Sequence, residues 1–70
     1  MLISARNQIS GAVVDIVRGA TTSHVRIDLG GRVVVTASVG TRSVDDLNLE
    51  PGSKVTAIIK ASDVLIGVDD

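Results

Sequence analysis

The segment that decides the fold is HVRIDLGGRVVVTASV, residues 24–39. From Val25 to Leu29 every second residue is apolar and its neighbours are polar, which is typical of a strand with one buried face. Gly30-Gly31 follows, and glycine accepts the positive φ angles that a tight hairpin turn demands. Residues 32–39 return as a valine-rich partner strand, so the segment predicts a β-hairpin and an all-β fold.

Outward from this hairpin, four further segments are predicted to be strands. They are Leu2–Asn7, Ile9–Val17, Lys54–Lys60 and Val64–Val68. Within Ile9–Val17, Gly11 marks either a bulge or a point of close approach to another backbone. Residues 19–22 are expected to turn that strand back into the hairpin. The pattern therefore predicts about six short strands.

The segment Thr41–Leu49 departs from the strand pattern and predicts a single helical turn. Ser43, followed three residues later by Asp46, resembles a helix capping box, although Glu or Gln is the usual partner. Pro51-Gly52 then predicts a turn that delivers the next strand. Residues 1–70 are expected to form one domain, a compact all-β barrel or sandwich with one short helical turn.

The size and composition of the chain predict that it assembles with other subunits. A domain of 70 residues is marginally stable alone, and without cysteine it has no disulfide or thiolate zinc site to stabilise it. Yet 44% of its residues are hydrophobic and none is aromatic. Residues 13–17 and 33–35 carry apolar side chains on both faces, which indicates burial on both sides. Scattered exposed valines are the alternative explanation, but the short length favours burial against another subunit.

Charge and residue content disfavour several classes of function. The net charge is −1 and the pI is about 5.6, so the chain lacks the basic face and the stacking aromatic residues of a nucleic-acid binder. The single histidine, His24, lies on the polar side of its strand and is expected to be exposed. We therefore expect no metal site, no cofactor and no catalytic set of side chains, and hence not an enzyme. No signal peptide or membrane span is visible, so we expect a soluble cytoplasmic protein.

Two short segments near the ends of the chain combine a cation with small or hydroxyl-bearing residues. These are Ser4-Ala5-Arg6-Asn7 and Lys60-Ala61-Ser62. Arginine supplies a planar fork of N–H donors, lysine a compact charge and serine a rotatable O–H, and this donor set suits a small oxyanion. The plain alternatives are a solvated Arg6 and a Lys60 that only blunts the edge of its strand.

Three longer motifs resemble those of a known family. They are Ile3-Ser4-Ala5-Arg6-Asn7-Gln8 followed by Gly11, Val44-Asp45-Asp46-Leu47 followed by Leu49-Glu50-Pro51-Gly52, and Thr56-Ala57-Ile58-Ile59-Lys60-Ala61-Ser62. Together they resemble the molbindins, small bacterial molybdate-binding proteins built from a TOBE (Mop) domain. The resemblance implies an OB-like β-barrel that exchanges strands in a dimer, with three dimers in a hexamer. It also implies molybdate or tungstate held at subunit interfaces for storage and homeostasis, without catalysis. The alternative is a nucleic-acid-binding or regulatory accessory domain, a role that OB-like barrels often have.

The resemblance also implies a set of ligand residues. Ser4, the backbone N–H of Ala5 and Arg6 would approach the anion from one subunit. Lys60 and Ser43 would come from a neighbouring one. Family members often have a hydroxyl residue three positions before Ser43, where this chain has Gly40. Thr41, a backbone N–H or a water molecule is expected to supply that contact. The complete candidate set is Ser4, Ala5, Arg6, Asn7, Thr41, Ser43, Lys60, Ala61 and Ser62.

Overall fold

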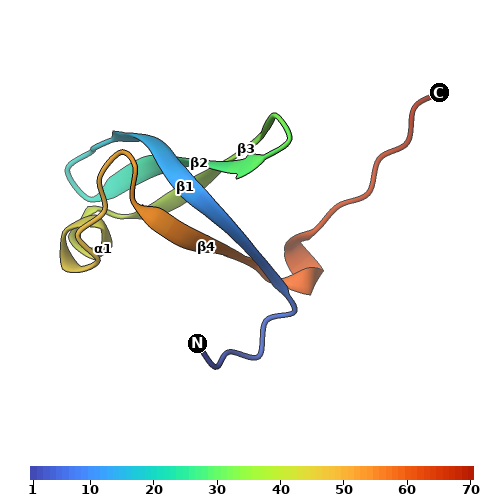
Figure 1. The fold of residues 1–70 in the computed structure, drawn as a ribbon, viewed down its shortest axis with the longest axis horizontal. Helices are drawn as coiled ribbons and strands as arrows, with labels where there is room; N and C mark the ends of the chain where they lie inside the picture. The colour runs from blue at the N-terminus through green and yellow to red at the C-terminus, as the bar shows by residue number, and fades with distance from the viewer.

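The computed structural model describes residues 1–70 as a small all-β half-barrel with one short α-helix (Figure 1). Its elements are β1 (Asn7–Val17), β2 (Thr22–Gly30), β3 (Val33–Gly40), α1 (Thr41–Asp46), β4 (Lys54–Ile59) and the 3-10 helix η1 (Ala61–Asp63). The four strands form one antiparallel sheet in the order β3-β2-β1-β4. The all-β prediction is confirmed, as are the strands expected within residues 9–17, 24–39 and 54–60.

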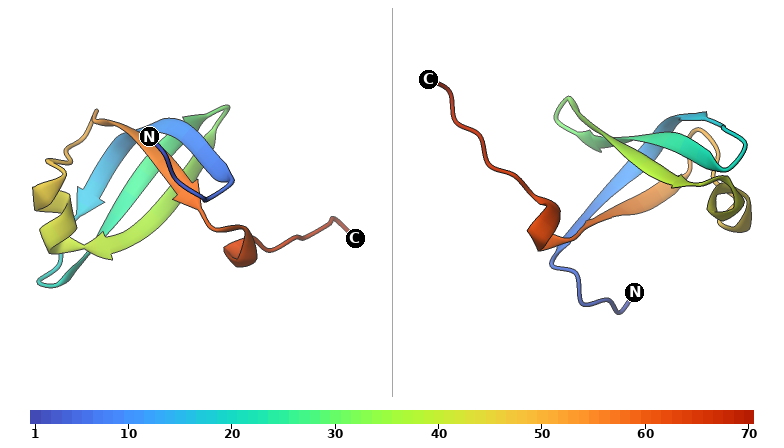
Figure 2. Two further views of the ribbon diagram at one scale, coloured as in Figure 1. Left: turned by 90° about the horizontal axis from the view of Figure 1, so that it is seen from below. Right: turned by 180° about the vertical axis from the view of Figure 1, so that it is seen from behind.

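Two of the predicted strands do not form. Residues 2–6, which precede β1, have no regular structure. Residues 64–70, here called the C-terminal tail, follow η1 and have none either. Both segments run away from the sheet (Figures 1 and 2). A strand needs a neighbour for its backbone N–H and C=O groups, and neither segment has one within this chain. The prediction was wrong here because an apolar alternation identifies a segment able to pair but does not identify its partner.

The predicted hairpin joins β2 to β3, with its turn one residue later than expected. Gly30 pairs with Val33, so Gly31 and Arg32 form the two-residue loop. Their φ angles of 58° and 66° are both positive, as a type I′ turn requires. The carboxylate of Asp28 accepts a hydrogen bond of 2.8 Å from the N–H of Gly30. This turn, together with the shift in pairing between Asp28 and Gly30, sets the register of β2 against β3.

β1 pairs with β2 on one side and with β4 on the other. Its bulge lies between Val13 and Asp15, where the register against β2 shifts, and not at Gly11. Gly11 is a point of close approach instead. A Cβ atom there would lie 2.6 Å from the carbonyl oxygen of Asp28 and 2.9 Å from Cγ2 of Ile27. Of the two roles expected for Gly11, the close approach is therefore confirmed.

α1 covers one end of the sheet and buries Val44, which is 1% exposed. Its N-cap residue is Gly40 and no side chain caps it, so the capping role predicted for Ser43 was wrong. The helix begins earlier because the N–H of Thr41 donates to the carbonyl of Thr21 at 2.9 Å, which ties its first turn to the sheet. Ser43 thus lies within the helix, where its carbonyl accepts the N–H of Leu47. No helix in the chain has the length and apolar character needed to cross a membrane.

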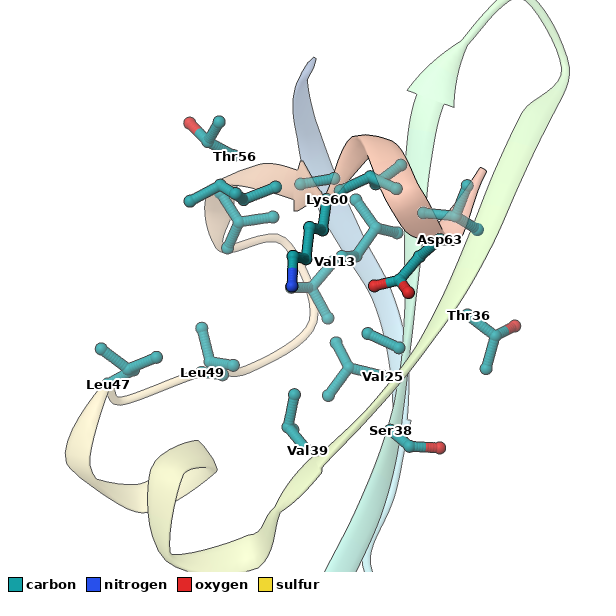
Figure 3. A pocket seen from close by; sticks show the side chains of 17 residues that line it. Val13, Val25, Thr36, Ser38, Val39, Leu47, Leu49, Thr56, Lys60 and Asp63 are labelled. Carbon is teal, nitrogen blue, oxygen red and sulfur yellow. The ribbon is translucent and has the colours of Figure 1, made fainter. Parts of the chain in front are cut away.

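The core of the chain is thin and open on one side. Only 6 of 70 residues are buried, and they are Val13, Ser23, Val25, Ile27, Val44 and Ala57. Beside them one side of the sheet leaves an apolar groove of about 610 Å³ (Figure 3). Its walls include Val13, Val25, Ile27, Val39, Leu49 and Ala57. One chain therefore forms a half-barrel and does not close the OB-like barrel that the resemblance implies, which leaves an unusually apolar surface without cover.

Candidate anion-binding site

The two clusters that the sequence singled out meet because β1 and β4 are antiparallel neighbours. In their register Asn7 stands opposite Ile59, and the side-chain amide of Asn7 donates to the carbonyl of Ile59 at 3.0 Å. Arg6 directly precedes Asn7, and Lys60 directly follows Ile59. The segment before β1 and the segment after β4 therefore leave the sheet at the same end, although more than 50 residues separate Asn7 from Ile59 along the chain.

Between these two segments lies an open depression of about 670 Å³, here called the anion depression. It is lined by Ile3, Ser4, Ala5, Arg6, Ile58, Lys60, Ala61, Ser62 and Asp63. Six of the nine candidate residues are in this set, namely Ser4, Ala5, Arg6, Lys60, Ala61 and Ser62. Arg6, Lys60 and two serines thus line one concavity of a single chain, whereas the resemblance implies that Arg6 and Lys60 come from different subunits. Their side chains make it a donor-rich environment for an oxyanion.

The backbone around the anion depression is held by short local hydrogen bonds. The side chain of Gln8 donates to the carbonyl of Ala5 at 2.7 Å, and the N–H of Asp63 donates to the carbonyl of Lys60 at 2.9 Å. With the bond from Asn7 to Ile59, these contacts position both walls of the depression. Asn7 itself does not line the depression, and its amide organises the backbone.

The two cations of the depression have no partner within the protein. Neither Arg6 nor Lys60 takes part in the chain's two salt bridges, which lie elsewhere. Neither side chain makes a hydrogen bond to another residue. Both are exposed, so their charges are open to a ligand.

The remaining two candidates, Thr41 and Ser43, lie with α1 at the opposite end of the sheet from η1 (Figure 1). The hydroxyl of Thr41 donates to the carbonyl of Gly19 at 2.9 Å and lies 2.7 Å from the buried hydroxyl of Ser23. Because a hydroxyl has one proton, Thr41 accepts in the second contact and has no proton left for an anion. Ser43 is exposed on α1 and makes no side-chain hydrogen bond in this chain, so only a second copy could bring it to the anion depression.

Asp63 is the residue of the depression that sequence reasoning missed. It follows Ser62 directly and lies in η1, where it lines both the anion depression and the apolar groove. The signal was present, since Asp63 is three residues beyond Lys60 and a single helical turn brings such residues to one side. An acidic residue beside a predicted anion site is nevertheless usually interpreted as a solvated surface residue.

Comparison with known proteins identifies the family. The TOBE domain model matches residues 3–66 of this chain. A probable molybdenum-pterin-binding protein of Haemophilus influenzae is 48% identical over 69 residues, which are 99% of this chain and 100% of the relative. The chain belongs to the molbindins. The family predicted from the three sequence motifs is therefore confirmed.

Solved structures of proteins similar to this molbindin share its fold. A molybdate-binding protein from Sporomusa ovata superposes with a TM-score of 0.90 at 37% identity, over 97% of this chain and 100% of that one. The cytoplasmic molybdate-binding protein ModG, in a form with molybdate bound, superposes with a TM-score of 0.93 at 39% identity. That comparison covers 99% of this molbindin and 49% of ModG, so this chain spans about half of the longer protein.

Proposed function

We propose that this molbindin binds molybdate or tungstate as an intact tetrahedral dianion in the anion depression, without chemical turnover. The observation that carries the proposal is the convergence of Arg6, Lys60 and two serine hydroxyls on one concavity of the chain. The names of its relatives support it, because they include molybdate-binding and molybdenum-pterin-binding proteins.

The physical requirement for such a site is to replace the water that the dianion loses. Removing a doubly charged anion from water is very costly unless charge and hydrogen bonds compensate for the lost hydration. Arg6 and Lys60 together balance the charge, and bonds from charged donors are roughly twice as strong as neutral ones. The hydroxyls of Ser4 and Ser62 can turn toward whichever oxygens the two cations leave free.

We further propose that the site is completed by assembly. The apolar groove is open, while the C-terminal tail exposes Leu65, Ile66 and Val68 by 87% or more. Exchange of this tail between two chains would cover both apolar surfaces and close each half-barrel into an OB-like barrel. Three such dimers in a hexamer would allow Ser43 of one subunit to approach the anion depression of another.

The cellular role that fits this chemistry is storage of molybdate and control of its free concentration in the cytoplasm. Since the ligand is held by ionic and hydrogen bonds alone, it can be released unchanged. The ModG relative is described as cytoplasmic, which supports the same compartment for this chain.

Calorimetric titration with molybdate tests the proposal. The Arg6→Ala variant should bind at least about tenfold more weakly, because a hydrogen bond to a charged group contributes about 1.5–3 kcal/mol. Arg32→Asn is the matched control. It removes the same charge at the β2–β3 turn, where φ is 66° and asparagine tolerates the positive angle. Near-normal affinity in Arg6→Ala, or an equal loss in both variants, would rule out the assignment of this depression.

A further inference from the structure

Asp63 is an acidic side chain in a depression otherwise suited to anions. It ends η1 and lines the anion depression together with Arg6 and Lys60. Figure 3 shows the ammonium of Lys60 and the carboxylate of Asp63 both extending over the adjoining apolar groove. Two positively charged residues and one negatively charged residue thus line the anion depression.

The charge of Asp63 is not neutralised by a direct partner. The two salt bridges of the chain involve the carboxylates of Asp45 and Asp15, not Asp63. No side-chain or backbone donor makes a hydrogen bond to the Asp63 carboxylate. An ionised carboxylate is an acceptor only, so it opposes any ligand oxygen that also has no proton to offer.

We propose that Asp63 is a specificity-determining residue that selects among tetrahedral anions by their protonation. Its carboxylate repels an oxyanion that carries no proton and accepts a hydrogen bond from one that does. This inference rests on the proposed function, because it concerns the same depression. It also implies that Asp63 holds the affinity for molybdate below the value that Arg6 and Lys60 alone would produce, which favours release from a storage protein.

The effect of Asp63 on anion affinity is limited by the exposure of its side chain. Asp63 is exposed, so its field is weakened by water and by salt. Interactions between exposed charges of this kind change a binding constant by about twofold to fivefold. The effect should therefore be moderate at low ionic strength and should shrink when the ionic strength is raised to about 1 M, where charges are screened beyond about 3 Å.

The test compares Asp63→Asn with Asp46→Asn at low ionic strength and mildly alkaline pH. Asparagine keeps the shape of the side chain, and Asp46 is an exposed aspartate on α1 at the other end of the sheet. Molybdate, which carries no proton, is titrated directly, and hydrogen phosphate, which carries one, is measured by competition. Circular dichroism and native mass spectrometry establish that both variants keep the fold and the assembly of the parent chain.

We expect Asp63→Asn to tighten molybdate binding about twofold to fivefold, with no such gain for hydrogen phosphate, and Asp46→Asn to change neither. An unchanged or weakened molybdate affinity in Asp63→Asn would overturn the inference. An equal gain for both anions, or an equal gain in the two variants, would do the same. A parent chain that binds no molybdate would instead overturn the proposed function, so the two failures are distinguishable.

Discussion

The Ile66→Ala substitution tests whether the C-terminal tail covers the apolar groove of a second subunit. In the single chain Ile66 is 92% exposed. At a site that stays exposed, such a change alters the free energy of unfolding by no more than about 0.5 kcal/mol. Along an extended segment, however, Val64, Ile66 and Val68 share one face, because side chains alternate. If the tail is exchanged, that face is buried in the groove.

The expected effect is then large. Truncation of a buried isoleucine to alanine costs about 2–5 kcal/mol through lost burial and the cavity left behind. A dimer that exchanges two tails contains the substitution twice, which gives roughly 4–10 kcal/mol of lost association free energy. At about 1.4 kcal/mol for each factor of ten, the dissociation constant of the dimer should rise by roughly three to seven orders of magnitude.

Native mass spectrometry and analytical ultracentrifugation over a dilution series measure this change. Thermal unfolding at several protein concentrations gives a second readout, since the melting temperature of an assembly depends on concentration. Asp69→Ala is the control, because it alters the same tail without removing apolar surface. If Ile66→Ala dissociates and melts like the parent chain, the tail does not cover the groove and the exchange model is refuted.

Two further variants probe the scaffold of the site. Gly11→Ala places a Cβ 2.6 Å from the carbonyl oxygen of Asp28. It should lower the free energy of unfolding, measured by urea denaturation, by about 1–3 kcal/mol. The control Ser10→Ala, at the exposed neighbouring residue, should change this free energy little. Thr41→Val removes the donor to the Gly19 carbonyl and should cost about 1–3 kcal/mol of stability, while calorimetry finds the molybdate affinity of the folded protein unchanged. A loss of affinity in Thr41→Val without a loss of stability would restore Thr41 as a ligand.

The strands that could be predicted from the sequence are those that have a partner within the chain. The alternation from Val25 to Leu29 and the glycines after it specify a hairpin by local chemistry alone. Residues 64–68 have a β-branched residue at every second position, but no strand of this chain lies beside that segment. The local sequence pattern predicts which face of a segment is apolar. Which other segment packs against that face depends on the folded and assembled protein.

For the candidate site, the sequence predicted the ligand residues better than their arrangement in space. Donor chemistry and family resemblance pointed to Arg6 and Lys60, but their common depression depends on the pairing of β1 with β4, which no local pattern encodes. Thr41 illustrates the limit for a single side chain. Its hydroxyl was a reasonable ligand by type, and the structure commits its proton to the carbonyl of Gly19.

The register between β1 and β4 is what joins stability to function in this chain. A slip of one residue would set Asn7 opposite Ile58 or Lys60 and would turn the side chains of one strand to the other face of the sheet. The bond from the Asn7 amide to the carbonyl of Ile59 opposes such a slip. The close approach at Gly11 is to Asp28 and Ile27, so it fixes β1 against β2 instead. The strand that directly follows Arg6 is therefore held against both of its neighbours, β4 and β2. Substitutions that loosen this register should therefore weaken anion binding even where they touch no ligand residue.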